Sequence, residues 1–254
     1  AGRLYSVFLD RTEDDSLASI DKHLLDLERI QGLPSYVLLL YVITHRDKLG
    51  LDDKHLATIV SFIVRFFVRR NLTDTPPTRD LTRLFMAIIE KLADKSGEEV
   101  VNTVREQLSA VSSSDEDFRR KLEGPVYDEN YGVTRFVLTS LAEQGMTKES
   151  YVDLWRMENK LFDWTIEHIL PQGSNIPGKW VDMIANGDVE KAKAFQQSHV
   201  HRLGNLTITG FNSALGNKDF ETKRDRKDRD GRYVGFKNAF NLNQDLARAE
   251  TWTV

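Results

Sequence analysis

Apolar residues recur at intervals of three and four through several long windows in the first 155 residues of this chain. This interval places them on one face of a helix, so each window predicts an amphipathic helix. The windows open at Leu17, Leu56, Leu81 and Val100. Turn-forming residues interrupt the pattern at 32–34, 75–78 and 96–97. The sequence therefore predicts a helical scaffold over residues 1–155.

Length and composition limit the class of protein. A chain of 254 residues that is 40% apolar can bury a large core as one large domain or two moderate ones. It contains no cysteine, which excludes disulfides and zinc sites built on thiolates and makes a cytoplasmic protein the default. The longest apolar run, Tyr36 to Ile43, is far shorter than the ~20 residues of a membrane span, so no membrane contact is expected. The first residue is not methionine, from which we expect a fragment with an N-terminal portion missing.

The net charge of -4 argues against attraction of nucleic acid to the whole surface. A local basic cluster, Arg65, Arg69 and Arg70, falls within one predicted helix. Such a cluster at a helix end either complements the helix dipole or contacts phosphates, and the sequence leaves both open.

The character of the chain changes near residue 160. Residues 162–170 alternate apolar and polar types and are rich in aromatic and β-branched residues, which predicts a strand ending at Pro171. Short helices are predicted at 179–185 and 189–197, a second strand at 206–209 and a helix over 212–227. We therefore expect a second domain over residues 156–254.

Two segments of this second domain carry chemically reactive side chains. Glu167 and His168 stand at the end of the first predicted strand. After an insertion of about thirty residues, Asn205 precedes the second predicted strand and Asn212 opens the following helix. These four side chains can converge on one site.

In combination, these segments resemble the C-terminal, HNH-like nuclease domain of the GmrSD-type restriction endonucleases, a modification-dependent, anti-phage family. The resemblance covers roughly residues 155–254. The matching features are Glu167-His-Ile-Leu-Pro-Gln172, Trp180, Leu203-Gly-Asn-Leu-Thr207, Asn212, Leu215-Gly-Asn217, Phe220 and Lys223. The family's N-terminal sensor domain, which resembles a nucleotide-dependent enzyme, has no counterpart here and is an expected partner.

The resemblance implies a role for each site residue. His168 would be the general base that deprotonates the attacking water. Glu167 and Asn212 would supply the oxygen ligands that Mg²⁺ or Mn²⁺ prefers. Asn205 would brace the loop that holds the histidine. The third motif position, a histidine in many HNH enzymes, is asparagine here, and Asn217 is an alternative to Asn212 as ligand.

Other residues near the motif are expected to contact DNA or to support the site: His201, Asn217, Lys218, Lys223 and Arg224. The lysines and arginine fall at spacings that could align them on one helix face toward a phosphate backbone. Intrahelical pairs with Asp219 and Asp228 are the alternative. His199 and His201 could hold zinc with His168, but no fourth strong ligand is evident.

The expected fold is mainly α, with a helical N-terminal portion followed by a ββα-metal (HNH) nuclease core elaborated by helices. The expected function is a metal-dependent DNA endonuclease or nickase, the effector part of a bacterial system that senses modified or foreign phage DNA. The alternative is a DNA-binding or regulatory module with a vestigial nuclease motif; a structural zinc protein is a third reading. A homo-oligomer would allow cleavage of both strands, whereas a monomer would nick.

Overall fold

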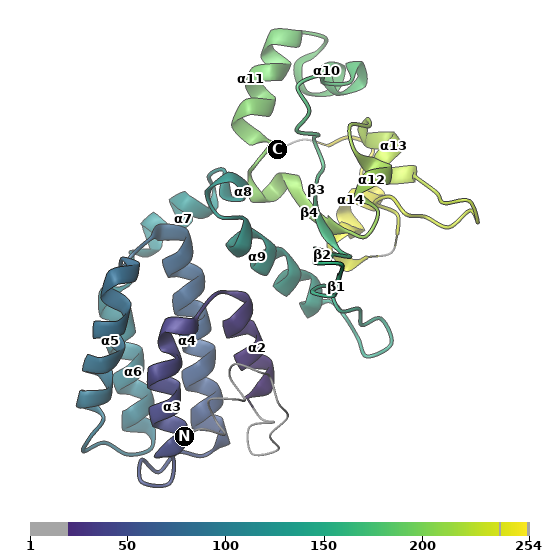
Figure 1. The fold of residues 1–254 in the computed structure, drawn as a ribbon. Helices are drawn as coiled ribbons and strands as arrows, with labels where there is room; N and C mark the ends of the chain where they lie inside the picture. Colours follow the sequence, from purple (N-terminus) through teal and green to yellow (C-terminus); the bar gives the residue numbers. More distant parts are fainter. Residues whose placement is uncertain (1–19, 239, 253–254) are drawn as a thin grey trace. The chain divides into compact units, whose positions relative to one another are not determined.

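The computed structural model describes residues 20–238 and 240–252, and it is mainly helical, as predicted (Figure 1). The chain forms two compact units, of which the first ends at Arg120 and the second begins at Lys121. This division falls within α7 (Asp115–Leu122) and lies earlier in the chain than the predicted change at residue 156. The difference arises because α9 (Tyr131–Gln144) packs against the second predicted strand, which belongs to the C-terminal unit.

The first unit is a set of packed helices. It contains α2 (Asp21–Arg29), α3 (Tyr36–Thr44), α4 (Asp53–Thr73), α5 (Thr78–Lys91) and α6 (Glu98–Val111). A 3₁₀ turn, η2 (Leu33–Ser35), leads into α3. The long helix α4 contacts α2, α3 and α6, while α5 contacts α3 and α6. Each predicted apolar window therefore becomes one helix of this bundle, although Leu17 lies outside the described residues.

Local sequence explains where α4 begins and ends. Asp52 accepts a hydrogen bond from the backbone nitrogen of His55 at 2.8 Å, and the His55 ring returns a contact to the Asp52 nitrogen. This reciprocal cap satisfies two donors that a helix start leaves open. The apolar face that follows is fully buried, with Ile63 at 0% and Phe67 at 1% exposure.

Two arginines of the α4 cluster form ion pairs and hydrogen bonds within the first unit. Arg69 pairs with Asp115 at 2.5 Å and donates to the Ser113 carbonyl. Arg70 donates to the Pro76 carbonyl, Asp74 and Thr78, and so fixes the loop that follows the helix. These contacts favour a structural role over phosphate contact for both residues.

In the described part of the second unit, short helices surround two small antiparallel sheets of two strands each. Its helices are α8 (Val126–Glu129), α9, α10 (Gly178–Ala185), α11 (Val189–His199), α12 (Asn212–Leu215), α13 (Phe220–Asp225) and α14 (Gln244–Arg248). Its strands are β1 (Met157–Glu158), β2 (Leu161–Phe162), β3 (Thr165–His168) and β4 (Leu206–Thr209). The 3₁₀ turns η3 (Leu203–Asn205) and η4 (Asn241–Asn243) complete it. β4 and helices α10 and α11 match the predicted ranges closely.

The single strand predicted over residues 162–170 is wrong in its extent. Phe162 belongs to the β1–β2 hairpin, whose turn residues Asn159 and Lys160 both have positive φ. Such a pair of left-handed residues is typical of a tight hairpin turn. The chain then restarts as β3, which pairs with β4 so that Glu167 faces Thr207 and His168 faces Leu206.

The continuous helix predicted over residues 212–227 is also wrong. Gly216, at φ 43°, ends α12 in the left-handed region, where a glycine is favoured. Asp219 then caps a separate helix, α13, by accepting from the Thr222 nitrogen at 3.1 Å. Residues 217 and 218 consequently lie in a loop between two helices.

Aromatic residues from distant segments form the core beside the β3–β4 sheet. Trp180 of α10 is fully buried against Phe220 and Trp252, and its indole nitrogen donates to the Lys218 carbonyl at 2.9 Å. The insertion between the two strands is therefore tied to the site by its tryptophan. None of the helices in the described part of the chain is both long and apolar enough to cross a membrane.

Candidate active site

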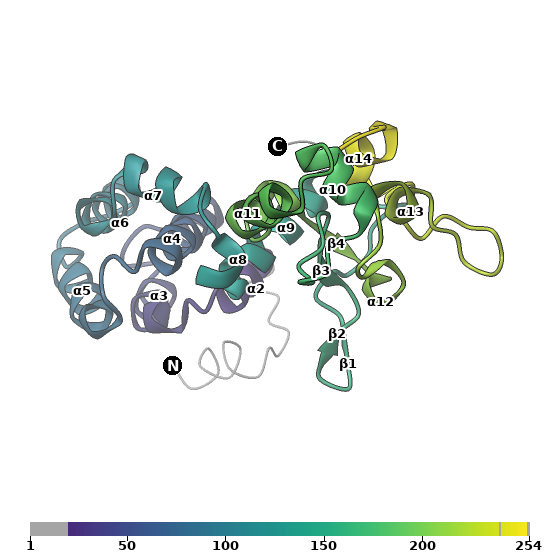
Figure 2. The ribbon, with the colours of Figure 1, turned by 90° about the horizontal axis from the view of Figure 1, so that it is seen from above.

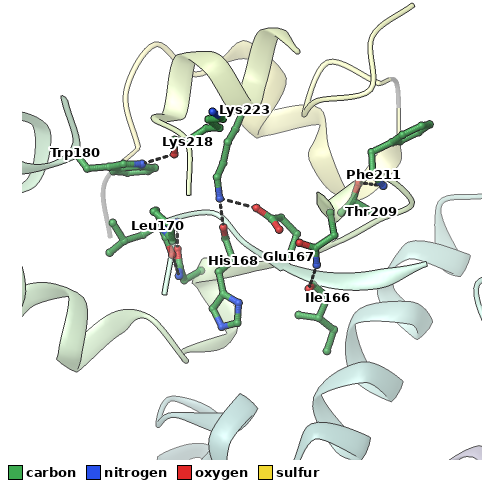
Figure 3. Close-up of polar contacts among 12 residues, drawn as sticks. Ile166, Glu167, His168, Leu170, Trp180, Thr209, Phe211, Lys218 and Lys223 are labelled. Atoms are coloured by element: carbon green, nitrogen blue, oxygen red, sulfur yellow. Dashed lines mark hydrogen bonds and ion pairs between the residues drawn. The ribbon is translucent and has the colours of Figure 1, made fainter. Parts of the chain in front are cut away.

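Glu167 and His168 are the last two residues of β3, and both are buried, at 3% and 5% exposure. Neighbouring residues on a strand point to opposite faces. Figure 3 shows this arrangement, with the Glu167 carboxylate and the His168 ring leaving the strand on opposite sides. Both residues are nevertheless among those that line one cavity of about 240 Å³. The end of β3 therefore forms part of the cavity wall.

Asn205 holds the two ends of the insertion together. Its carboxamide oxygen accepts from the Leu170 nitrogen at 2.7 Å, and its amide nitrogen donates to the carbonyls of Leu170 and Val200. The side chain is 2% exposed, so these bonds replace water that cannot reach it. Asn205 fixes the backbone just after His168 and does not line the cavity.

The ring of His168 is held by two aromatic neighbours. Its Nε2 lies 3.2 Å from Nδ1 of His201, so one ring donates to the other. Tyr127 stacks on His201 and meets His168 edge to face, with ring centroids 4.6 Å apart in the second case. Burial, with further contributions from His201 and Lys223, lowers the pKa of His168 to about 4. The imidazole is therefore neutral at neutral pH.

Glu167 forms a buried ion pair with Lys223 of α13. The lysine Nζ donates to Glu167 Oε1 at 2.5 Å and to the His168 carbonyl at 2.6 Å (Figure 3). Burial raises the pKa of Glu167 and lowers the pKa of Lys223, while their mutual attraction opposes both shifts. Lys223 thereby links α13 to the end of β3.

Asn212 is anchored to β3 through its amide nitrogen, which donates to the Ile166 carbonyl at 2.8 Å and to the Thr165 hydroxyl at 3.1 Å. Within the described residues, neither the Asn212 carboxamide oxygen nor Glu167 Oε2 accepts a hydrogen bond. Both residues line the cavity. A carboxylate oxygen and a carboxamide oxygen without donors are suitable ligands for a hard divalent cation.

The cavity also receives residues from other segments. Its remaining lining residues are Tyr127, Ile166, Pro171, Gln172, Gly173, Gly216, Asn217 and Lys223. Asn217 donates to the Asn175 carbonyl at 2.7 Å, and its side chain packs against Gly173. Asn212 and Asn217 thus both reach the cavity, and both alternatives for the amide ligand remain.

The predicted basic helix face does not form. Lys223 is fully buried, Lys218 lies in the loop before α13, and Arg224 is paired with Asp225 at 2.6 Å. The prediction failed because the residue spacing assumed one continuous helix, which Gly216 interrupts. His201 contacts the His168 ring, and its role in the site stays a prediction.

Two features of the site were not predicted from the sequence. Tyr127 comes from α8, far from the motif, and carries no sequence signal of its own. The burial of Lys223 was not predicted either. It agrees with the burial of Phe220 in the same helix and with the need of the buried Glu167 carboxylate for a partner of opposite charge.

The two histidines considered as zinc ligands, His199 and His201, bond to different partners. His199 bonds within its own helix, to the Phe195 carbonyl at 2.9 Å, whereas His201 faces His168. Among residues 20–238 and 240–252, no three His, Asp or Glu side chains gather to hold a metal ion. Any metal in the cavity would therefore need amide oxygens, water or phosphate among its ligands.

A family model for the C-terminal domain of GmrSD restriction endonucleases matches residues 112–254, which is more than half of the chain. The chain belongs to this family. No curated protein and no solved structure matches it. The GmrSD family is one of restriction endonucleases, which indicates a nuclease of the hydrolase class acting on DNA. The match begins close to α7 and includes every residue of the cavity.

Proposed function

We propose that this chain is a metal-dependent endodeoxyribonuclease of the HNH type, and that the cavity at the end of β3 is its active site. The observation that carries the proposal is that His168, which is buried and neutral, lines the same cavity as Glu167 and Asn212, each of which has an oxygen without a donor. The pairing of β3 with β4, followed by α12 and α13, supports a ββα arrangement.

His168 is the general base of this mechanism. A neutral imidazole can accept the proton of an attacking water. If the His168 Nε2 donates its hydrogen to His201, the lone pair remains on Nδ1, which has no partner in the described part of the chain. His201 can then direct its own Nε2 hydrogen toward Asp128, 3.6 Å away. His201 and Tyr127 are positioning residues that orient the base.

Glu167 and Asn212 would hold the cation. Lys223 keeps the Glu167 carboxylate in one orientation and leaves Oε2 available, while β3 fixes the amide of Asn212. A bound Mg²⁺ or Mn²⁺ ion supplies charge neutralisation at the scissile phosphate and at the leaving oxygen. The expected biological setting is bacterial defence in the cytoplasm against modified or phage DNA, with a sensor domain as partner.

A plasmid assay tests the proposal. With Mg²⁺ or Mn²⁺, the purified chain is expected to convert supercoiled plasmid to open-circular or linear forms, and a chelator should stop this. His168→Ala should reduce the rate at least about 100-fold, since removal of a general base typically costs that much. His199→Ala is the matched control, because His199 bonds only within its own helix region.

The outcomes separate the candidate roles. Equal cutting by wild type and His168→Ala, with both folded by circular dichroism, would contradict the assignment of the base. In the same assay, Asn212→Ala should raise the metal concentration needed for half-maximal rate more than Asn217→Ala. The reverse order would make Asn217 the ligand.

A DNA-binding module with a vestigial nuclease motif is the second candidate. The ion pair between Lys223 and Glu167 favours it, because the carboxylate is already neutralised by the protein. That candidate predicts binding of duplex DNA without cleavage under any divalent metal.

A further inference from the structure

Residues 226–237, which we call the basic hairpin, leave the end of α13 and fold back on themselves. Lys227 and Tyr233 form an antiparallel bridge, and the Val234 nitrogen donates to the Arg226 carbonyl at 2.9 Å. Figures 1 and 2 both show this segment projecting beyond α13, away from α12. It is therefore a defined protrusion of the second unit.

The tip of the basic hairpin is held by its own side chains. The Asp228 carboxylate accepts from the backbone nitrogens of Asp230 and Arg232, each at 2.9 Å. Gly231 occupies the left-handed region at φ 79°, which closes the turn without a side-chain clash. Local bonds of this kind hold an exposed turn in one conformation.

The base of the basic hairpin is packed directly on the helix that supplies the buried lysine of the cavity. The Phe236 nitrogen donates to the Lys223 carbonyl, and the Lys237 nitrogen donates to the Arg224 carbonyl, both at 3.1 Å. A Cβ atom at Gly235 would lie 2.0 Å from the Lys223 carbonyl oxygen, so only glycine permits this approach. The hairpin and the cavity are thus positioned by the same short helix.

The charge of the basic hairpin contrasts with the chain as a whole, whose net charge is -4. Its charged residues are the basic Arg226, Lys227, Arg229, Arg232 and Lys237 and the acidic Asp228 and Asp230. Intramolecular ion pairs engage two of the basic groups, Arg232 and Lys237.

Three basic groups of the hairpin remain available. Arg226 and Arg229 are exposed and make no ion pair within the described residues. Lys227 is exposed as well and lies over the Tyr233 ring at 4.5 Å, which holds its side chain along the hairpin.

We propose that the basic hairpin holds duplex DNA by its sugar-phosphate backbone beside the active-site cavity, with Arg226, Lys227 and Arg229 neutralising phosphates. The inference rests on the proposed nuclease function and names the element that binds its substrate. A hairpin backbone that is already held in one conformation loses little freedom on binding, and phosphate contacts position a protein on DNA irrespective of sequence. In this proposal the basic hairpin makes the phosphate contacts that the residue spacing had suggested for one face of a helix.

Salt-dependent binding tests this assignment. The variant Arg226→Gln/Lys227→Gln/Arg229→Gln should bind a duplex oligonucleotide, in chelator, about 10- to 100-fold more weakly than wild type at low salt. The slope of log affinity against log salt should shrink by about 0.9 for each lost phosphate contact, or roughly 2 to 3 in total. The matched control is Lys148→Gln/Lys160→Gln/Lys191→Gln, which removes the same charge from exposed lysines elsewhere in the second unit. The control should keep the wild-type slope.

The outcomes distinguish this inference from the function on which it rests. If wild type cuts plasmid and the hairpin variant binds with wild-type affinity and slope, the inference is overturned and the nuclease stands. Equal weakening by the control variant also overturns it, because net charge alone then explains binding. A wild-type chain that neither binds nor cuts DNA removes the proposed function itself.

Discussion

Glu167 and Lys223 form a buried ion pair, and both residues line the cavity. Loss of one partner leaves an uncompensated charge on a buried side chain, so Lys223→Met should cost about 3 to 5 kcal/mol of unfolding free energy. Replacing both, as Glu167→Leu/Lys223→Met, should recover much of that loss, because no charge then remains buried. Urea unfolding of Lys223→Met, of Glu167→Leu and of the double variant measures the coupling.

The control for this cycle is Lys179→Met. Lys179 also pairs with acidic residues, Asp219 and Glu221, but its side chain is exposed. Exposed pairs contribute little because water and salt screen them, so this variant should unfold almost as wild type does. Equal destabilisation by Lys179→Met and Lys223→Met would mean that the buried pair has no special role.

The lowered pKa of His168 predicts how stability depends on pH. Its ordinary value is 6.5, and burial lowers the pKa to about 4 in the folded chain. The unfolded state therefore binds the proton more readily, so the stabilising contribution is complete above pH 6.5 and is lost as the pH falls toward 4. The loss amounts to about 3 kcal/mol at most.

Chemical unfolding in chelator between pH 7 and pH 4.5 measures this dependence. The variant His168→Gln removes the titrating ring, so its unfolding free energy should fall less steeply over the same interval. Identical slopes for wild type and variant would show that the His168 ring takes up a proton equally well in both states.

At the scale of elements, long periodic segments were predictable and short interrupted ones were not. The apolar spacing located α4, α5 and α6 because each buries one continuous face over several turns. The breaks at Asn159 and Gly216 were not predicted. Each arises from the positive φ of one residue, and the spacing of apolar side chains does not report the backbone conformation of a single residue.

The same limit applies to the candidate site. Its motif residues were identified because they stand close together in sequence around β3 and β4. The partnership of Glu167 with Lys223 joins positions 56 residues apart, and it depends on how α13 packs. Tyr127 enters from α8 for the same reason. Long-range packing of this kind leaves no mark in the spacing of a single sequence.

At the scale of the whole molecule, the placement of residues 121–155 decides which piece of the chain folds as a unit. Arg135 of α9 is 1% exposed, and its guanidinium donates to the Trp164 carbonyl at 2.7 Å and to the Leu154 carbonyl at 2.6 Å. The same group lies 3.5 Å from the Phe162 ring centroid. Helix α9 thus supports the segment that leads into β3.

A fragment of residues 121–254 should therefore unfold cooperatively in urea, whereas a fragment of residues 156–254 should lack a cooperative transition. The shorter fragment loses α9 and leaves the Trp164 carbonyl and the inner face of β4 without partners. Limited proteolysis provides an independent measurement. Equal stability of the two fragments would place the domain boundary at residue 156, where the sequence alone put it.

Asn205 closes the excursion between β3 and β4 with three hydrogen bonds. By joining Leu170 to Val200, this side chain fixes both ends of the intervening excursion. The entropy of closing a loop grows only with the logarithm of its length, so doubling the excursion costs about 0.6 kcal/mol. A single hydrogen bond contributes about as much. A longer or shorter excursion would therefore cost little in loop closure, provided that the change leaves in place residues 171–173, which line the cavity, and Trp180, which lies in the core.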